Sequence, residues 1–382
     1  MEFKGLKEQY HRNQKAIDKA IQKVLNDTNF ISGNQVNELE EELAAYVGAK
    51  NCVTCANGTD ALQLALMVWN IGAGDAVFVP DFTFFSTAEV VSLVGATPIF
   101  VDVEEETFNI SPNSLKRAIV EVEKQGQLRA RVVISVDLFG QPANYDKIRP
   151  IVKEHKLLLL EDAAQGFGGS IRGKRACTFG DMATTSFFPV KPLGCYGDGG
   201  AVFTDNDDWA ELLRSYRIHG KGNDKYDNIR IGLNSRLDTL QAAVLQVKLN
   251  LFREYELNAV NIVAKKYGKE LSDRIKVPGI LEGYLSSWAQ YTIRLENENV
   301  RDMLQRHLKE NEVPSMIYYL KPLHEQKAFE KYKFLPASVN NTTECCMTVL
   351  SLPMHPYVSE SDLRKVNKIV ENSLNRVRRN MR

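Results

Sequence analysis

The sequence predicts an α/β protein built on a mostly parallel sheet, followed by a smaller C-terminal α/β unit. Between residues 51 and 160, short β-branched runs alternate with amphipathic helical patterns, as in a parallel sheet with crossover helices. The predicted strands are continuously apolar, as at residues 157–160, which is typical of strands covered on both faces. A turn signal at Pro278-Gly279 precedes a shorter set of elements, so we expect two domains in the 382 residues.

Apolar periodicity predicts the elements of the larger unit. Apolar residues recur at helical spacing over residues 7–26 and 36–47, ahead of the first strand. Short β-branched or apolar runs predict strands at residues 51–55, 76–79, 97–101, 131–136 and 157–160. Amphipathic patterns predict the helices that alternate with them, at residues 59–69, 83–94, 112–124 and 145–155.

The alternation ends after Asp162. Residues 168–178 predict a hairpin, and two further runs predict strands at residues 184–188 and 201–204. Residues 236–270 form one extended helical pattern or two in series. The C-terminal unit contains the segment 288–295, a helix at 300–311, a strand-like segment at 315–319 and a final helix at 359–375.

Charge and composition exclude several classes of protein. The 48 basic residues balance the 48 acidic ones, so net charge gives no reason to expect a nucleic acid or an acidic membrane as partner. No apolar stretch approaches the roughly 20 residues of a membrane helix, and the first residues lack the apolar core of a secretory signal. We therefore expect a cytoplasmic protein. Six cysteines are too sparse for a disulfide scaffold, and Cys52 and Cys55 are interpreted as core thiols, with no metal site.

The glycine clusters do not form a nucleotide-binding fingerprint. Gly166-Phe-Gly168 and Gly197-Asp-Gly199 lack the third glycine three residues further on. Residues 168–174 match a phosphate P-loop until Arg175 replaces the metal-binding Ser or Thr, and they lie in a predicted hairpin. These clusters therefore predict no dinucleotide or P-loop site.

Asp162 and Lys191 form the informative pair. Asp162 ends a buried strand, where open α/β sheets bind ligands, and Lys191 follows a strand in a glycine-rich loop 29 residues later. Taken singly, Asp162 is a strand-end cap and Lys191 a surface charge. Together they meet the needs of pyridoxal phosphate, which requires an amine for its aldehyde and an anion beside its protonated ring nitrogen.

A phosphate site is predicted near this pair. Residues 56–60 join a strand to a helix, so free backbone N–H groups and the helix dipole favour an anion there, with an ordinary N-cap as the alternative. Ser186 is placed to add a hydroxyl. Phe84 follows the next strand, where an aromatic ring can cover the cofactor, although core packing is the default for Phe84.

Five motifs, covering nearly the whole chain in the family's order, resemble the DegT/DnrJ/StrS sugar aminotransferases. They are Asn-Gly-Thr-Asp-Ala-Leu at 57–62, Glu-Asp-Ala-Ala-Gln at 161–165, Ser-Phe-Phe-Pro-Val-Lys-Pro-Leu-Gly at 186–194, Gly-Asp-Gly-Gly at 197–200, and Gly-Leu-Asn-Ser-Arg-Leu-Asp-Thr-Leu-Gln-Ala-Ala at 232–243. Residues 191–200, 234–241 and 351–356 are most similar to enzymes that aminate C3 of UDP-2-acetamido-2-deoxy-3-oxo-D-glucuronate. Those enzymes serve bacterial surface polysaccharides such as lipopolysaccharide O-antigen.

The resemblance implies a fold-type I transferase that uses pyridoxal phosphate at the interface of a homodimer. Residues 1–250 then form the cofactor-binding large domain with an N-terminal helical arm. Residues 251–382 form the small C-terminal α/β domain, including a linking helix.

The resemblance also implies a role for each site residue. Lys191 bonds covalently to the cofactor, Asp162 pairs with its ring nitrogen, and Gln165 bonds its ring hydroxyl. The phosphate is held by Gly58, Thr59 and Ser186, and by Asn234 of the partner chain, while Phe84 stacks on the ring. Arg236, Tyr318 and Tyr319 are expected near the substrate, with Tyr318 standing where we expect a histidine in many relatives.

The predicted reaction moves an amino group from L-glutamate, released as 2-oxoglutarate, to the keto carbon of a UDP-linked sugar. A 4-oxo-sugar aminotransferase is the main alternative, since it shares the cofactor residues and differs only in the sugar pocket. A sugar dehydratase of the same fold is expected to carry a histidine in place of Lys191. A non-catalytic sensor or regulatory protein on this fold is expected to lose a cofactor-linking residue, and none is lost.

Overall fold

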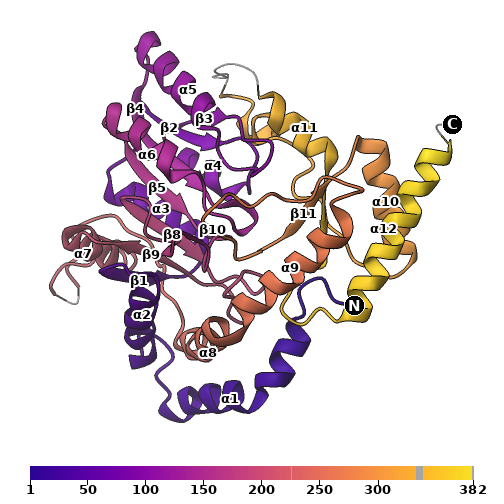
Figure 1. Cartoon of the computed structure of the whole chain (residues 1–382). Coiled ribbons are helices and arrows are strands. Elements are labelled where there is room, and N and C mark those ends of the chain that lie inside the picture. The colour runs from indigo at the N-terminus through magenta and orange to yellow at the C-terminus, as the bar shows by residue number, and fades with distance from the viewer. Residues whose placement is uncertain (225, 333–338, 381–382) are drawn as a thin grey trace.

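Seven strands form one mostly parallel sheet at the centre of the larger unit (Figure 1). The computed structural model describes residues 1–224, 226–332 and 339–380, with side chains as far as Arg376. The sheet order is β1-β9-β8-β5-β4-β2-β3. Only β9 runs antiparallel to its neighbours β8 and β1. The strands are β1 (Asn51–Cys55), β2 (Asp75–Pro80), β3 (Thr97–Val101), β4 (Arg129–Val136), β5 (Leu158–Asp162), β8 (Met182–Ser186) and β9 (Gly200–Thr204).

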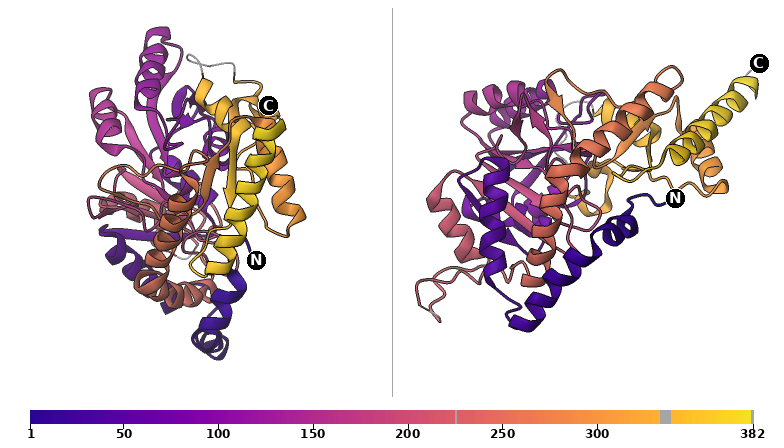
Figure 2. Two further views of the ribbon diagram at one scale, coloured as in Figure 1. Left: turned by 45° about the vertical axis from the view of Figure 1, so that its right-hand side comes forward. Right: turned by 60° about the horizontal axis from the view of Figure 1, so that its bottom comes forward.

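Helices cover both faces of this sheet (Figures 1 and 2). Successive strand residues point to opposite sides, so Val133 joins one core cluster while Val132 and Ile134 join the other. The first cluster includes residues of α2 (Asn34–Val47), α5 (Pro112–Gln125), α6 (Tyr145–Glu154) and α8 (Thr239–Leu251). The second includes residues of α3 (Gly58–Val68), α4 (Ser86–Leu93) and α7 (Asp207–Tyr216). The prediction of an α/β fold on a mostly parallel sheet is confirmed.

The smaller unit has its own core. Antiparallel strands β11 (Tyr291–Arg294) and β12 (Val349–Leu352) form its sheet, and buried apolar residues from Val260 to Val370 form its cluster. Its helices are α9 (Leu257–Leu271), α10 (Glu298–Glu310), α11 (Asn340–Thr348) and α12 (Glu360–Asn380). The domain boundary between residues 250 and 251 stays a prediction; it falls at the last residue of α8, just before the π-helical turn η2 (Phe252–Glu256) that leads into α9.

Several predicted elements differ from the observed ones. Residues 315–319 do not form a strand, because only Met316 makes a single bridge, to Ser351, and the strand paired with β11 is β12. Strand β12 follows α11 directly, with no turn residues between them, so no sequence pattern marks where the strand begins. The helical pattern over 236–270 begins at Thr239 and comprises two helices joined by η2. Strand β8 begins two residues before the predicted 184–188.

The hairpin predicted at 168–178 is present. Strands β6 (Ser170–Ile171) and β7 (Lys174–Arg175) pair across it, and β10 (Tyr284–Leu285) adds a third strand. Gly173 has φ +83°, a left-handed turn conformation that glycine adopts without strain. The P-loop alternative is therefore excluded by geometry, because a hairpin and not a helix follows the glycines.

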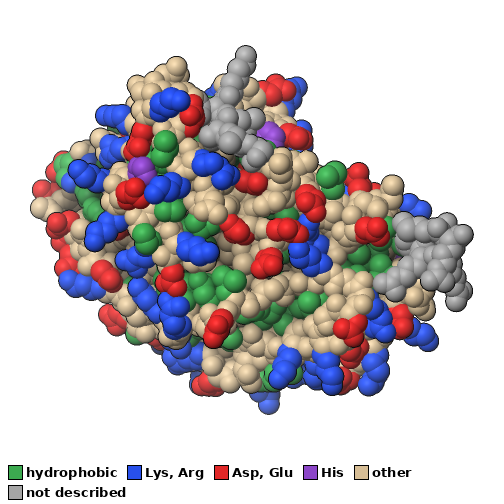
Figure 3. All heavy atoms as spheres, turned by 45° about the horizontal axis from the view of Figure 1, so that its top comes forward, with side chains coloured by type: hydrophobic (Ala, Val, Ile, Leu, Met, Phe, Trp, Pro, Cys, Tyr) green, Lys and Arg blue, Asp and Glu red, His purple; other side chains and the backbone are tan. Residues whose placement is uncertain are grey.

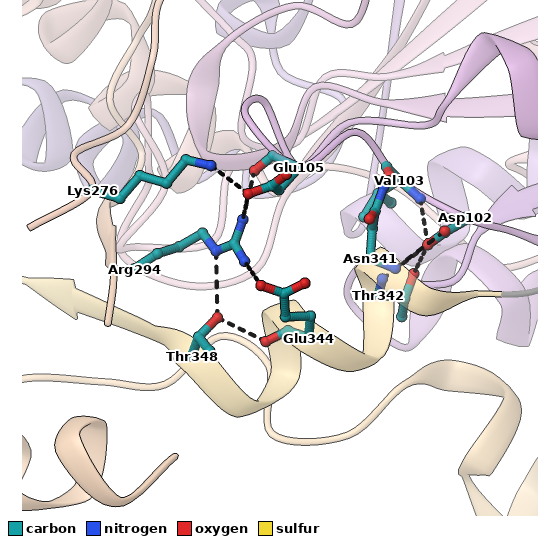
Figure 4. A network of polar contacts seen from close by, with 9 residues as sticks. All are labelled: Asp102, Val103, Glu105, Lys276, Arg294, Asn341, Thr342, Glu344 and Thr348. Carbon is teal, nitrogen blue, oxygen red and sulfur yellow. Dashed lines mark hydrogen bonds and ion pairs between the residues drawn. The ribbon is translucent and has the colours of Figure 1, made fainter. Parts of the chain in front are cut away.

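A polar network joins the two units beyond the end of β3 (Figure 4). Asp102 caps the first turn of α11, with Oδ1 accepting from the backbone N–H and the hydroxyl of Thr342, both at 2.9 Å. The buried Arg294 of β11 donates to Glu105 at 2.8 Å and to Glu344 at 2.5 Å. These contacts hold the smaller unit against the loop that follows β3, the edge strand of the large sheet.

The N-terminal arm lies on the side of the molecule opposite to this polar network (Figure 1). Helix α1 (Leu6–Asp27) runs along α8, with Ile17 and Val24 buried (Figure 2). The residues before it reach the smaller unit, where the N–H of Met354 donates to the carbonyl of Phe3 at 3.3 Å. None of the helices in the described part of the chain combines the length and the apolar character that a membrane span requires. Acidic and basic side chains are interspersed over the face shown in Figure 3.

Candidate active site

Asp162 ends the central strand β5, at the carboxyl edge where parallel sheets bind ligands. Its Oδ1 accepts from the N–H of Ala164 at 3.1 Å, and its Oδ2 accepts from the hydroxyl of Thr87 at 3.2 Å. Burial raises the pKa of this carboxyl, and the Ala164 N–H, the Lys191 ammonium and the Thr87 hydroxyl oppose that rise. A positive group placed beside Asp162 would favour its ionised form further.

Glu161, the preceding residue, points away from Asp162 and serves the fold. Its carboxylate accepts from the N–H groups of Cys177 and Phe179, each at 2.6 Å. The neighbouring Asp137 accepts from the hydroxyl of Tyr145 at 2.7 Å, and burial raises its pKa well above the usual range. Because successive side chains of a strand point to opposite faces, Asp162 faces the site whereas Glu161 faces the interior.

Lys191 lies in the loop between β8 and β9. Its N–H donates to the carbonyl of Phe188 at 2.9 Å, and a Cβ on Gly194 would lie 2.5 Å from the carbonyl oxygen of Pro189, so the tight turn requires that glycine. Burial lowers the pKa of the Lys191 amine, while Asp162 acts to raise it. The lowered pKa favours the neutral amine, the form that attacks an aldehyde.

The turn at the start of α3 forms an anion seat. Asn57 caps the helix by accepting from the N–H of Asp60 at 2.8 Å, so the first N–H groups, those of Gly58 and Thr59, have no partner within the helix. A Cβ on Gly58 would lie 2.7 Å from Cβ of Ser186. Only glycine fits here without displacing Ser186, and this close approach brings the Ser186 hydroxyl beside the free N–H groups.

Gln165, Tyr319 and Phe84 belong to loops, and their side chains approach one another near Asp162. Gln165 Oε1 accepts from the N–H of Phe139 at 2.8 Å, and its Nε2 donates to the hydroxyl of Tyr319 at 3.3 Å. The Phe84 ring lies 6.5 Å from that of Tyr319 and is 54% exposed. Core packing, the default expected for Phe84, is therefore wrong, because its ring faces open space at the site. Tyr318 lies 6.5 Å from the ring of Phe3.

No hydrogen bond or ion pair joins Asn234 or Arg236 to Lys191 among the described residues. Both residues precede α8, and Arg236 Nη2 donates to Asn234 Oδ1 at 2.7 Å. Between them, Ser235 accepts from the N–H of Ala56 at 3.0 Å, which places this segment beside the anion seat. Asn234 itself is exposed.

Sequence reasoning missed three residues of this region. Thr87 bonds Asp162, His324 Nδ1 lies 2.5 Å from the buried Asp81 in the loop that carries Phe84, and Lys4 enters the surroundings of Lys191. Thr87 lies only three residues after Phe84, so its closeness in sequence to a predicted site residue could have indicated it. Lys4 and His324 carry no local signal, since each reaches the site from a distant part of the chain.

These residues fit pyridoxal phosphate. The α3 turn with its two free N–H groups suits the phosphate, the buried Asp162 suits a protonated ring nitrogen, and the Lys191 amine lies close enough to Asp162 for the two charges to interact. Cys52 and Cys55 are buried and free, as predicted for core thiols, and no cluster of metal ligands occurs among the described residues.

Comparisons with known proteins agree with this reading of the site. The chain matches the model of the DegT/DnrJ/EryC1/StrS aminotransferase family over residues 11–371. It is 44% identical to UDP-2-acetamido-2-deoxy-3-oxo-D-glucuronate aminotransferase of Pseudomonas aeruginosa, over 95% of this chain and 98% of that protein. It is 37% identical to a pleiotropic regulatory protein of Geobacillus stearothermophilus, over 96% of both chains. It is also 37% identical to UDP-N-acetyl-3-dehydro-alpha-D-glucosamine 3-aminotransferase of Acidithiobacillus ferrooxidans, over 93% of this chain and 92% of that one.

Solved structures give the same result. A DegT/DnrJ/EryC1/StrS aminotransferase from Brucella abortus superposes with a TM-score of 0.95 at 46% identity, covering 97% of this chain and 99% of that one. A Bacillus subtilis structure with bound cofactor PMP superposes with a TM-score of 0.85 at 26% identity, covering 95% of this chain and 82% of that one. PMP is the aminated form of pyridoxal phosphate. The chain belongs to the DegT/DnrJ/EryC1/StrS aminotransferase family and is a pyridoxal-phosphate-dependent aminotransferase.

Proposed function

We propose that this enzyme transfers the amino group of L-glutamate to C3 of a UDP-2-acetamido-2-deoxy-3-oxo-hexose or -hexuronate. The observation that carries the proposal is the likeness, at 44% and 37% identity over more than nine-tenths of the chain, to two aminotransferases named for UDP-linked 3-oxo sugars. The product of such a reaction, a UDP-linked amino sugar, suits the biosynthesis of bacterial surface polysaccharides such as lipopolysaccharide O-antigen. We propose a cytoplasmic location on the same grounds.

Lys191, Asp162 and Gln165 would carry the chemistry. Bound pyridoxal phosphate supplies the electron sink through which an amino group is exchanged for a keto group. Lys191 would hold the cofactor covalently and, once displaced by the amino donor, move a proton to and from the donor carbon, a task that its lowered pKa supports. Asp162 would keep the ring nitrogen protonated. Gln165 would donate through Nε2 to the ring hydroxyl.

The remaining site residues would hold the phosphate, the ring and the sugar. Gly58, Thr59 and Ser186 are assigned to the phosphate and Phe84 to the ring face, with Tyr318, Tyr319 and Arg236 next to the substrate. Asn234 would complete the phosphate site from the partner chain of a homodimer. Large exposed apolar side chains near Asn234 support that interface: Ile229 is 54% and Ile231 91% exposed.

The deciding experiment supplies the purified enzyme with glutamate and four acceptors, the 3-oxo and 4-oxo forms of a neutral and of a C6-carboxylated UDP-sugar. NMR of each product assigns the aminated carbon, and Lys191→Ala protein is the control. We expect amination at C3 and none with the control. Efficient turnover of a 4-oxo sugar with none of the 3-oxo compounds would replace our assignment by the 4-oxo alternative.

A regulatory protein is the second candidate. It is favoured by the relative named as a pleiotropic regulatory protein at 37% identity. The retained Lys191 and Asp162, each with the environment described above, support catalysis instead. Holoenzyme that fails to exchange an amino group with glutamate would favour the regulatory role.

A further inference from the structure

The segment before α1 reaches the surroundings of the catalytic lysine. Gly5 lies against the ring of His355, where a Cβ would be 2.5 Å from Nδ1, and the carbonyl of Phe3 accepts from Met354. Lys4, between them, lines a cavity together with Lys191, Ser287 and Trp288. The cavity thus places a second amine next to the residue that would hold the cofactor.

The charge of Lys4 is incompletely satisfied in this cavity. Its ammonium has three N–H donors, and among the described residues its Nζ hydrogen-bonds only to the carbonyl of Ala289. Lys4 forms no ion pair with a carboxylate among the described residues. Glu256 lines the same cavity, and its Oε1 accepts from Gln9 and from the Tyr357 hydroxyl, each at 2.6 Å. Lys4 is partly exposed, and most of its N–H donors have no partner among the described residues, so the site is suited to a negative ligand.

The pKa shifts of the surrounding groups agree with this geometry. Burial, with the neighbouring Lys191, lowers the pKa of Lys4 to about 7. Burial also lowers the pKa of His355 to about 4, so that histidine adds no positive charge at neutral pH. A carboxylate entering the cavity would raise the Lys4 pKa again and hold the ammonium form.

We propose that Lys4 is a substrate-binding residue that takes a carboxylate of the reacting molecule, either that of the amino-acid donor or the C6 carboxylate of a sugar uronate. The proposal rests on the aminotransferase function proposed above. Lys4 enters the cavity beside Lys191, whereas Arg236 is hydrogen-bonded to Asn234 outside it. Lys4 would therefore decide whether carboxylated molecules react faster than neutral ones of the same shape.

The test follows loss of the pyridoxal-phosphate absorbance in single-turnover reactions of the holoenzyme with three amino donors. The donors are glutamate, a UDP-2-acetamido-3-amino uronate and its neutral 3-amino counterpart. We expect Lys4→Met to lower kcat/KM by about 10- to 100-fold for one carboxylated donor, the loss typical of a charge-assisted hydrogen bond, while the neutral sugar changes little. The donor that responds identifies the source of the carboxylate. Lys4→Arg should recover part of the rate.

Lys7→Met is the matched control, because the Lys7 side chain is 85% exposed on the same helix end. It should leave all three reactions unchanged. Calorimetry with the non-reacting ligands glutarate, UDP-glucuronate and UDP-glucose gives a second readout, in which Lys4→Met should weaken only a carboxylated ligand. Equal losses for all three donors, or no loss for any, would overturn the role of Lys4. Wild-type protein that reacts with glutamate but with neither amino sugar would instead refute the sugar substrate, and the glutamate reaction would then decide on Lys4.

Discussion

Replacing Asp162 by asparagine tests whether one buried negative charge drives the chemistry. The side chain keeps its size, and its carbonyl can still accept from the N–H of Ala164, now at 3.1 Å. The hydroxyl of Thr87, 3.2 Å from Oδ2, can reverse to accept from the new amide, because a hydroxyl both donates and accepts. The substitution therefore preserves the local hydrogen bonds and removes only the charge.

The expected loss follows from the burial of Asp162, which is 5% exposed, so that solvent does not screen its charge. Deleting one group that stabilises developing charge in such a site typically slows a reaction by about 10²- to 10³-fold, or about 2.7–4 kcal/mol in activation free energy. We expect a loss of that size in the glutamate half-reaction. Binding of the cofactor phosphate at the α3 turn should change much less.

Stopped-flow absorbance of the bound cofactor measures this half-reaction in a single turnover. Cofactor content and the melting temperature show whether the variant is folded and loaded. Thr87→Val is the control, because it removes a hydrogen bond to Asp162 but keeps the charge, and it should cost far less rate than Asp162→Asn. A near-normal rate for folded, loaded Asp162→Asn protein would show that Asp162 is only a strand-end cap.

Four further predictions concern other parts of the site. Borohydride reduction and peptide mapping should find the pyridoxyl group on Lys191, and a label on another lysine would refute that assignment. Mixing inactive Lys191→Ala with inactive Asn234→Ala protein should restore some activity, since one hybrid site has both residues; no recovery after demonstrated subunit exchange would place Asn234 in its own chain's site. If Lys4 takes the carboxylate of the amino-acid donor, Arg236→Lys should slow the uronate more than the neutral 3-oxo sugar, because a planar guanidinium binds a carboxylate through two bonds. Equal losses on both sugars would reject this role of Arg236. His324→Asn should lower the melting temperature more at pH 6 than at pH 9. The hydrogen bond to Asp81 raises the His324 pKa above 6.5. The stabilisation by this bond is therefore complete below pH 6.5 and is lost as pH rises through the folded pKa. A difference in melting temperature between wild type and variant that is the same at both pH values would contradict this prediction.

The Asp81–His324 pair shows two opposing effects. The pKa of His324 is raised by its hydrogen bond to Asp81, yet the pKa of Asp81 is also raised, because its burial outweighs the attraction of the histidine. The raised pKa of His324 governs stability near neutral pH, since the ordinary pKa of histidine, 6.5, lies in that range. The pair fixes the loop that carries Phe84 to residues near Tyr319.

The sequence by itself determined the α/β class, the order of the large sheet's elements and the Asp162–Lys191 pair. These depend on local patterns: apolar runs buried on both faces, helical periodicity and glycine-rich turns at strand ends. Residue chemistry at the carboxyl ends of β5 and β8 then pointed to pyridoxal phosphate, because parallel strands bring those ends to one edge. The anion seat at Gly58 was also visible as a strand-to-helix turn.

Only the tertiary structure decided which distant segments complete the site. Tyr319 meets Gln165 across 154 positions, and Thr342 meets Asp102 across 240, through contacts that no local periodicity encodes. The outward direction of Phe84 and the entry of Lys4 beside Lys191 likewise depend on how the smaller unit and the N-terminal segment pack against the sheet. Such contacts are set by the burial of whole surfaces against one another, so a sequence window carries no signal for them.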